Sequence, residues 1–214
     1  MILVACGLQR EAKIIGCKGV IAVAGGGDAG RLEAMLEAQA AGAIMIVSSG
    51  IAGALDPMLV VGDVVIDFKP LPSPEGEGLS RTFPHAHFGA IIGQDHIAVS
   101  IAEKAALAAS GALAVDMESH IAARVAARHG LPFLAIRTIS DTAHETLPPA
   151  ALVGMNPDGS MALGKVLASL ARRPGQLPAL IRTGRSAELA FKSLVEIHQK
   201  LAPLWATLLA QGSV

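Results

Sequence analysis

Short apolar runs alternate with amphipathic stretches along most of the chain. Runs of the length expected for buried strands occupy residues 2–6, 20–24, 43–47, 64–68, 113–115 and 133–138. Between several of them, apolar residues at three- and four-residue spacing predict helices over 31–41, 97–110 and 117–129. Because strands that alternate with helices form sheets covered by helices, the pattern predicts an α/β fold with a central mixed sheet.

Two later segments follow other patterns. Residues 70–84 contain four prolines and two glycines among serine and glutamate, which predicts a long mobile loop. From residue 159 onward the strand pattern stops, and the chain is expected to be helical with interruptions at 173–175 and at Pro203. We therefore predict an α/β domain over residues 1–170 and a helical C-terminal extension over 171–214.

Composition excludes several classes of protein. The 214 residues are 52% hydrophobic with a mean hydropathy of +0.52, enough for one packed domain plus an appendage. The net charge of −1 argues against nucleic-acid binding, and Cys6 and Cys17 form no C-x-x-C pair that would indicate zinc. We expect no leader peptide and no membrane-spanning run, and hence a cytoplasmic protein.

Charge is divided unevenly between the body of the chain and its C-terminal 50 residues. Residues 1–164 hold 10 Lys and Arg against 16 Asp and Glu, whereas residues 165–214 hold 7 against 2. Within 186–210, apolar side chains form a helical stripe: Phe191, Leu194, Val195, Ile197, Leu201, Leu204, Trp205 and Leu208. A basic, apolar helix predicts peripheral contact with the inner face of a membrane, and the alternative is packing on the protein's own core or on another subunit.

Two glycine-containing segments follow predicted strands. Residues 25–30 match G-x-G-x-x-G, but the next strand, 44–50, ends without the acidic residue that a bound dinucleotide requires. These glycines are better explained by a tight turn or by backbone amides that approach an anion or a sugar. Residues 48–53 form a second expected turn, so the two turns predict a shared cleft at the carboxyl ends of the strands.

Four carboxylates stand at predicted strand ends. Glu11 follows the first strand, Asp116 and Glu118 flank a strand-to-helix junction, and Asp141 follows the last strand. Because strand ends meet at one edge of a parallel sheet, we expect these groups to converge and to divide acid, base and hydroxyl-binding roles. The histidines are scattered without metal-ligand spacing, so we expect no metal and no cofactor.

Several motifs together resemble those of the purine nucleoside phosphorylase and methylthioadenosine nucleosidase superfamily. The paired signature is Val-Asp-Met-Glu-Ser at 115–119 with Ile-Arg-Thr-Ile-Ser-Asp at 136–141. Further landmarks come in the same order as in that family, at 7–11, 25–27, 49–53 and 61–65. The resemblance covers roughly residues 1 to 170 and implies a phosphorylase/nucleosidase-like fold, cleavage of a purine nucleoside and a homo-oligomer.

The resemblance also implies roles for individual residues. Asp141, placed by Ser140, corresponds to the acid that protonates the purine at N7, and Glu11 corresponds to the carboxylate that orients the attacking water. Met117 and Glu118 correspond to the ribose-binding pair. The resemblance further implies that Ser49 and Gly50 bind the substrate. If the protein is a phosphorylase, it also implies that phosphate is bound by Arg10, Gly27 and Ser49.

Within the superfamily, segments 102–119 and 172–178 resemble the hopanoid-associated branch, which implies release of adenine from adenosylhopane in hopanoid biosynthesis. Alternatives are a soluble methylthioadenosine or adenosylhomocysteine nucleosidase, a purine nucleoside phosphorylase, or a non-catalytic nucleoside- or lipid-binding protein. Asp116 stands where the family usually has Glu, and Arg10 stands where the nucleosidases are usually acidic. Water and phosphate therefore both remain open as nucleophile, with phosphate as a possible co-substrate.

Overall fold

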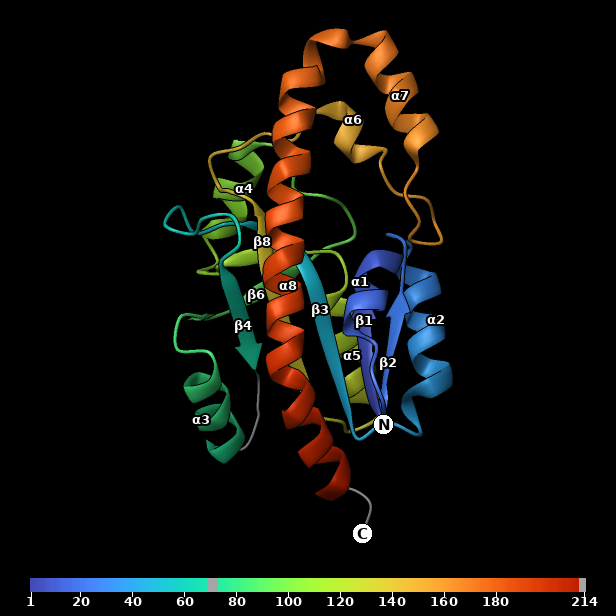
Figure 1. The fold of residues 1–214 in the computed structure, drawn as a ribbon, viewed down its shortest axis with the longest axis vertical. Helices are drawn as coiled ribbons and strands as arrows, with labels where there is room; N and C mark the ends of the chain where they lie inside the picture. Colours follow the sequence, from blue (N-terminus) through green and yellow to red (C-terminus); the bar gives the residue numbers. More distant parts are fainter. Residues whose placement is uncertain (69–72, 212–214) are drawn as a thin grey trace.

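A mixed β-sheet forms the centre of the molecule (Figure 1). The computed structural model describes residues 1–68 and 73–211. The strands are β1 (Ile2–Cys6), β2 (Val20–Ala24), β3 (Met45–Ala54), β4 (Val64–Phe68), β5 (His87–Phe88), β6 (Ile91–Gly93), β7 (Ala114–Asp116) and β8 (Phe133–Asp141). The main order is β2-β1-β3-β8-β4-β5, in which β1, β2, β3 and β8 run parallel and β4 runs antiparallel to β8. Strand β7 pairs antiparallel with the end of β3 and parallel with β6.

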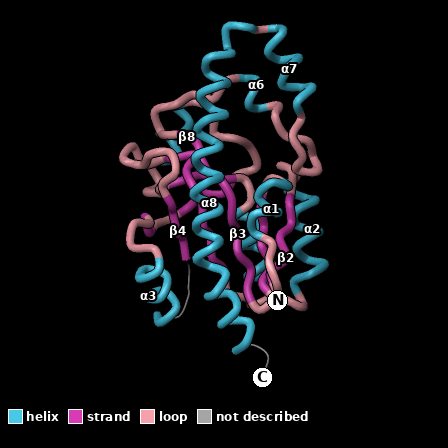
Figure 2. Tube along the Cα trace, in the orientation of Figure 1, coloured by secondary structure: helices cyan, strands magenta, loops and turns pink. Residues whose placement is uncertain are grey.

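Helices cover both faces of this sheet, as Figure 2 shows. They are α1 (Gln9–Ile15), α2 (Ala29–Ala40), α3 (Ser73–Thr82), α4 (Ile101–Ala108), α5 (Ser119–Arg128), α6 (Pro149–Leu152), α7 (Leu163–Arg172) and α8 (Leu177–Gln211). Side chains of β1 alternate between the faces: Val4 packs in the cluster that includes α8, and Leu3 packs in the cluster that includes α2 and α5. The predicted α/β fold with a mixed sheet is confirmed.

The two long strands differ from the prediction. Strands β3 and β8 stay paired from Ile46 opposite Phe133 to Gly53 opposite Asp141. The expected glycine turn at 48–53 is therefore wrong, because those residues continue β3 between β8 and β7. Glycines in this part of β3 leave room above the strand for buried polar side chains, since a Cβ at Gly53 would lie 3.1 Å from Asp141 Oδ2.

Two further predictions, both based on proline residues, are wrong. Residues 73–82 form α3 instead of a loop, since a proline in the first turn of a helix costs no intrahelical hydrogen bond. The remainder of the expected loop at 70–72 lies outside the described residues. Pro203 does not interrupt α8, because it is exposed while Leu201 and Trp205 on the opposite face are buried against the sheet. The interruption at 173–175 is confirmed, as α7 ends at Arg172 and a 3₁₀ turn follows.

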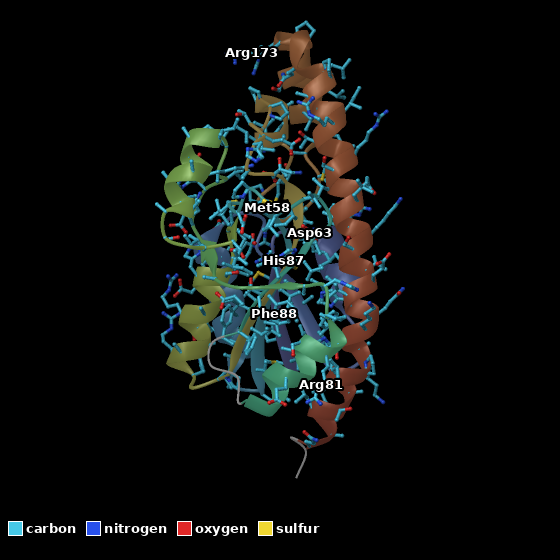
Figure 3. All side chains as sticks on the ribbon, turned by 90° about the vertical axis from the view of Figure 1, so that its left-hand side faces the viewer. Met58, Asp63, Arg81, His87, Phe88 and Arg173 are labelled. Atoms are coloured by element: carbon cyan, nitrogen blue, oxygen red, sulfur yellow. The ribbon has the colours of Figure 1, made fainter. Side chains whose placement is uncertain are left out.

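Helix α8 crosses the sheet along its length (Figure 1). The apolar stripe on its C-terminal half packs into the main core, where Leu194, Leu201 and Trp205 are almost fully buried. The stripe therefore packs on the protein's own core, as the alternative interpretation of this helix predicted, and is not available for contact with a membrane. Helices α6 and α7 and the start of α8 extend beyond the strands, with Arg173 at the far end from Arg81 of α3 (Figure 3). Within the described residues, no helix is both long and apolar enough to cross a membrane.

Candidate functional site

Arg137 is the centre of a buried charged cluster. It lies in β8, its side chain is fully buried, and its Nε is 2.6 Å from Asp116 Oδ2 and its Nη2 3.2 Å from Glu118 Oε2. Its Nη2 also donates to the Ser48 hydroxyl on the neighbouring strand β3. Its Nη1 has no hydrogen-bond partner among the described residues. A buried guanidinium with an unused donor is well placed to bind a polar ligand or a water molecule.

Glu11 is anchored beside this cluster by backbone amides. Its Oε2 accepts hydrogen bonds from the Gly7 and Leu8 amides at 2.8 Å, and its Oε1 accepts one from the Ile51 amide at 2.8 Å. Burial raises the pKa of Glu11, while Arg137 and the three amides act in the opposite direction. The carboxylate is thereby held in one orientation with a raised pKa, as a general base requires.

Gly50 explains how Glu11 and Arg137 come so close to β3. A Cβ atom at this position would lie 2.5 Å from Glu11 Oε1 and 2.8 Å from Arg137 Nη1. Only a glycine leaves room for both groups. The structure therefore places Gly50 beneath the predicted site, as part of a strand and not of a turn.

Glu118 and Asp116 share the charge of Arg137 but lie in different environments. Burial raises the pKa of Glu118 to about 8, with Arg137 opposing and the carboxylates of Asp116 and Glu11 adding to the rise. Asp116 Oδ1 accepts hydrogen bonds from the amides of Glu118 at 3.0 Å and Ser119 at 2.8 Å, two backbone groups at the start of α5 that have no partner within the helix. Three carboxylates around one guanidinium carry excess negative charge, so the cluster favours keeping a proton.

Asp141 forms a second group at the end of β8. The Ser140 hydroxyl lies 2.8 Å from Asp141 Oδ1, and the buried ammonium of Lys104 donates to Asp141 Oδ2. Asp141 and Arg137 come from the same strand, so β8 fixes the position of one relative to the other. Ser140 and Asp141 are adjacent in β8, and the hydrogen bond between their side chains fixes one relative to the other, while their roles toward a substrate stay predictions.

Ser49 faces helix α8. Its hydroxyl lies 2.9 Å from His198 Nε2, and both side chains are buried. Burial lowers the pKa of His198 to about 4, so this histidine is neutral at physiological pH. The Ser49 hydroxyl is thus already used within the protein.

The glycine turn between β2 and α2 meets the chain segment that leads to α7. Gly26 and Gly27 have φ angles of +68° and +74°, and a Cβ at Gly27 would lie 2.8 Å from Met155 Cε and 3.5 Å from Met117 Cε. Gly26 donates its amide to the carbonyl of Gly7 at 2.9 Å. The turn thereby brings Gly27 and Met117, two of the predicted site residues, close together.

Arg10 is engaged elsewhere. Its guanidinium forms a two-point ion pair with Glu188 of α8 and lies 4.0 Å from the centre of the Phe191 ring. Both partners of the ion pair are about half exposed. In this arrangement the charge of Arg10 is balanced at the surface, and its predicted phosphate-binding role stays a prediction.

Sequence reasoning assigned no role to Arg137, Lys104 or His198. Arg137 lies inside the motif at 136–141, and its charge directly after the apolar run 133–136 was the available signal. Lys104 in α4 contacts Asp141, and His198 in α8 contacts Ser49. Both are distant in sequence from their partners, so no motif spacing could have predicted these contacts.

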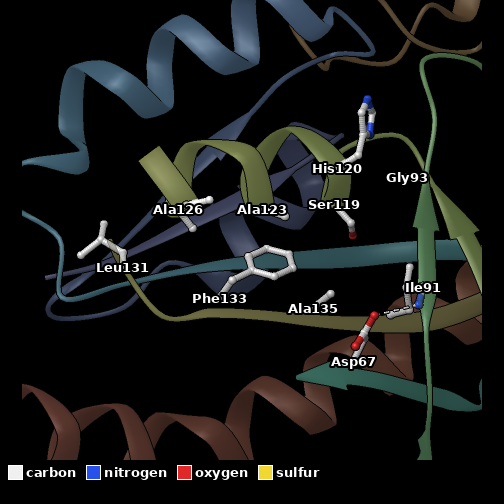
Figure 4. A pocket seen from close by; sticks show the side chains of 11 residues that line it. Asp67, Ile91, Gly93, Ser119, His120, Ala123, Ala126, Leu131, Phe133 and Ala135 are labelled. Carbon is white, nitrogen blue, oxygen red and sulfur yellow. Dashed lines mark hydrogen bonds between the residues drawn. The ribbon is translucent and has the colours of Figure 1, made fainter. Parts of the chain in front are cut away.

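A separate pocket lies between α5 and the strands (Figure 4). Ser119, His120 and Phe133 contribute to its lining, and Asp67 accepts a hydrogen bond there from the Ile91 amide at 3.0 Å. It contains none of the residues predicted to act on a substrate. Across residues 1–68 and 73–211, no group of three or more His, Cys, Asp or Glu side chains is arranged to hold a metal ion.

Comparison with known proteins supports a nucleosidase-like fold. Residues 75–172, slightly less than half of the chain, match the model of the phosphorylase superfamily. The fold resembles the Helicobacter pylori 5′-methylthioadenosine/S-adenosylhomocysteine nucleosidase at 18% identity and a TM-score of 0.57, over 91% of this chain and 97% of that one. Futalosine hydrolase of H. pylori has the same identity and coverage with a TM-score of 0.55.

A third similar structure is a nucleosidase of the same type from Colwellia psychrerythraea in complex with adenine. It is 16% identical, with a TM-score of 0.59 over 94% of this chain and 95% of that one. No curated protein sequence is significantly similar to the chain. These likenesses show that the chain has the fold of these nucleosidases.

Proposed function

We propose that this protein cleaves the N-glycosidic bond of a purine nucleoside by hydrolysis. One observation carries the proposal: β8 holds Arg137 inside a cluster of buried carboxylates and presents Asp141 at its end, on a fold shared with purine nucleosidases. Bond cleavage creates positive charge on the sugar and negative charge on the base. It therefore needs carboxylates beside the sugar and an acid beside the purine.

Glu11 is the group that activates the nucleophile in this proposal. Its raised pKa makes it a stronger base than an exposed carboxylate, and the Gly7, Leu8 and Ile51 amides hold it in place. Glu118 binds the ribose hydroxyls, and the negative charge of the carboxylate cluster around Arg137 stabilises the positive sugar in the transition state. Met117 packs against the sugar, and Asp141 gives a proton to N7 of the leaving purine.

Water fits this cluster better than phosphate. Glu11, Asp116 and Glu118 surround a single cation, so a phosphate dianion would meet excess negative charge. The one basic residue predicted to hold phosphate, Arg10, is paired with Glu188. We therefore assign the attack to a water held between Glu11 and Arg137 Nη1, which has no hydrogen-bond partner in the part of the chain that the structure describes.

The decisive test measures adenine release from methylthioadenosine, adenosylhomocysteine and adenosylhopane, each with and without phosphate. We expect adenine and free sugar at a rate that phosphate does not change. Glu11→Gln and Asp141→Asn should each lower kcat at least ~100-fold, because each removes a proton-transfer group. Glu196→Gln, an exposed change on α8, is the matched control. If none of these nucleosides is cleaved but one binds, the protein is a non-catalytic binding protein.

For the substrate we propose adenosylhopane, in which a lipid is attached to the nucleoside. The resemblance of segments 102–119 and 172–178 supports this assignment. A second support is the apolar surface of α7, where Leu163 and Leu167 have 63% and 65% of their surface exposed. The segment before α7 adjoins the site, because the Gly159 carbonyl accepts a hydrogen bond from the Gln9 amide at 3.0 Å. We expect a higher kcat/KM for adenosylhopane than for methylthioadenosine. A higher value for methylthioadenosine would exclude adenosylhopane as the preferred substrate.

Peripheral contact with an anionic membrane is part of this substrate proposal. The supporting surface is the exposed end formed by α7 and the start of α8, where Arg172, Arg173, Arg182 and Arg185 lie and where residues 159–187 contain no acidic residue. Each basic residue near an anionic surface contributes about 1 kcal/mol. The protein should therefore co-sediment with phosphatidylglycerol vesicles at low salt, and R172E/R173E should weaken this. Absence of binding, or self-association through this end, would refute membrane contact.

A further inference from the structure

Lys104 is a fully buried lysine whose charge the proposed reaction has not yet used. Its helix α4 begins at Ser100, whose hydroxyl accepts the Glu103 amide at 3.1 Å, and the side chain of Lys104 runs inward to β8. A lysine with no exposed surface is rare unless its ammonium is paired, because removing the charge from water is costly. The buried ammonium of Lys104 therefore needs hydrogen-bond acceptors within the protein.

The ammonium of Lys104 has three acceptors. It donates to Asp141 Oδ2, to the Thr142 carbonyl at 2.7 Å and to the Glu145 carbonyl at 3.2 Å. An ammonium has three N–H groups, so all of them are used within the protein. Lys104 consequently has no donor left for a ligand, and any effect on a substrate must pass through Asp141 or the segment after it.

The carboxyl group of Asp141 is held at both oxygens. Lys104 holds Oδ2, and the Ser140 hydroxyl lies 2.8 Å from Oδ1 and 3.1 Å from the Ala52 carbonyl. On the side of β3, a Cβ at Gly53 would lie 3.1 Å from Oδ2, so the strand leaves only enough room for the carboxyl group. The orientation of Asp141 is therefore fixed before any substrate binds.

We propose that Lys104 is a positioning residue for the acid that protonates the leaving purine. The inference rests on the proposed function. In the step concerned, the C1′–N9 bond breaks, its electron pair moves into the purine and N7 takes the proton of Asp141, while water bonds to C1′ and gives a proton to Glu11. The carboxylate left behind is stabilised by the Lys104 ammonium, which also keeps the carboxyl group directed at the purine. Charge placed in advance where charge develops lowers the barrier to the step.

The test is a double-mutant cycle on adenine release from the best substrate found above. Lys104→Met should lower kcat about 100-fold and leave KM within about threefold, because the loss concerns the proton transfer and not binding. In an Asp141→Asn background, the same change should lower kcat by less than about threefold, since residues that act as one unit are not additive. Lys18→Met, at an exposed position far from the site, is the matched control.

Further variants guard against a purely structural explanation. Lys104→Arg keeps the charge and should retain at least a tenth of the wild-type kcat, whereas Lys104→Gln keeps an amide donor for the carbonyls and should lose as much as the methionine variant. If Lys104→Met does not fold, Lys104→Gln replaces it in the double-mutant cycle. An unchanged kcat in Lys104→Met or Lys104→Gln, or an equal loss in both Asp141 backgrounds, overturns the inference. A wild type that releases no adenine overturns the proposed function instead.

Discussion

Replacing Glu118 with glutamine should make the protein more stable at neutral pH. Burial raises the pKa of Glu118 from 4.5 to about 8, so the folded protein binds more protons than the unfolded chain between these values. Stability therefore falls as pH rises through this window. At pH 7 the solution is about 2.5 pH units above the unfolded pKa, and at roughly 1.4 kcal/mol per unit the loss of stability is ~3–4 kcal/mol. Glutamine resembles the protonated acid and avoids this loss.

The measurement is urea unfolding of the wild type and Glu118→Gln at several pH values. The gain in the free energy of unfolding should be near zero at pH 4.5 and should grow to about 3 kcal/mol at pH 7, while adenine release falls because the glutamine amide replaces a carboxyl group that binds the ribose hydroxyls. Glu196→Gln should change stability by less than about 0.5 kcal/mol throughout. A Glu118→Gln protein that is less stable at pH 7, or a gain that does not depend on pH, would refute the reasoning.

Two further predictions concern β3 and α8. Gly50→Ala should lower kcat about 100-fold, because the new Cβ displaces the Glu11 carboxylate; Gly78→Ala, where no atom lies within 4 Å, should leave the rate unchanged. The pKa of His198 falls from 6.5 to about 4 in the folded state, so the unfolded chain binds more protons between these two pH values. The free energy of unfolding of the wild type therefore decreases by ~3 kcal/mol as the pH drops through this window. His198→Gln, which keeps a partner for Ser49, should remove most of this acid sensitivity in urea unfolding; an unchanged pH slope would contradict it.

Local pattern was enough to predict the sheet and most of its helices. Strands β1, β2 and β4 have the predicted bounds, since a short apolar run between polar segments has few other ways to be buried. Errors arose where long-range packing outweighs local preference. Small residues at 48–53 stay in a strand because β7 and β8 lie on either side, and Pro203 stays in a helix because Leu201 and Trp205 are buried beneath it.

The sequence by itself determined the residue types and the strand ends from which the site is built. Glu11 and Asp141 are recognisable because each follows a parallel strand, where ligands bind in α/β sheets, whereas Glu118 follows β7, which runs antiparallel to β3, and reaches the site through Arg137. Only the tertiary structure decided what surrounds them. Burial around Arg137 sets the protonation of Glu118, and Lys104 reaches Asp141 from α4, because dielectric environment and contacts between distant segments arise only when the elements pack.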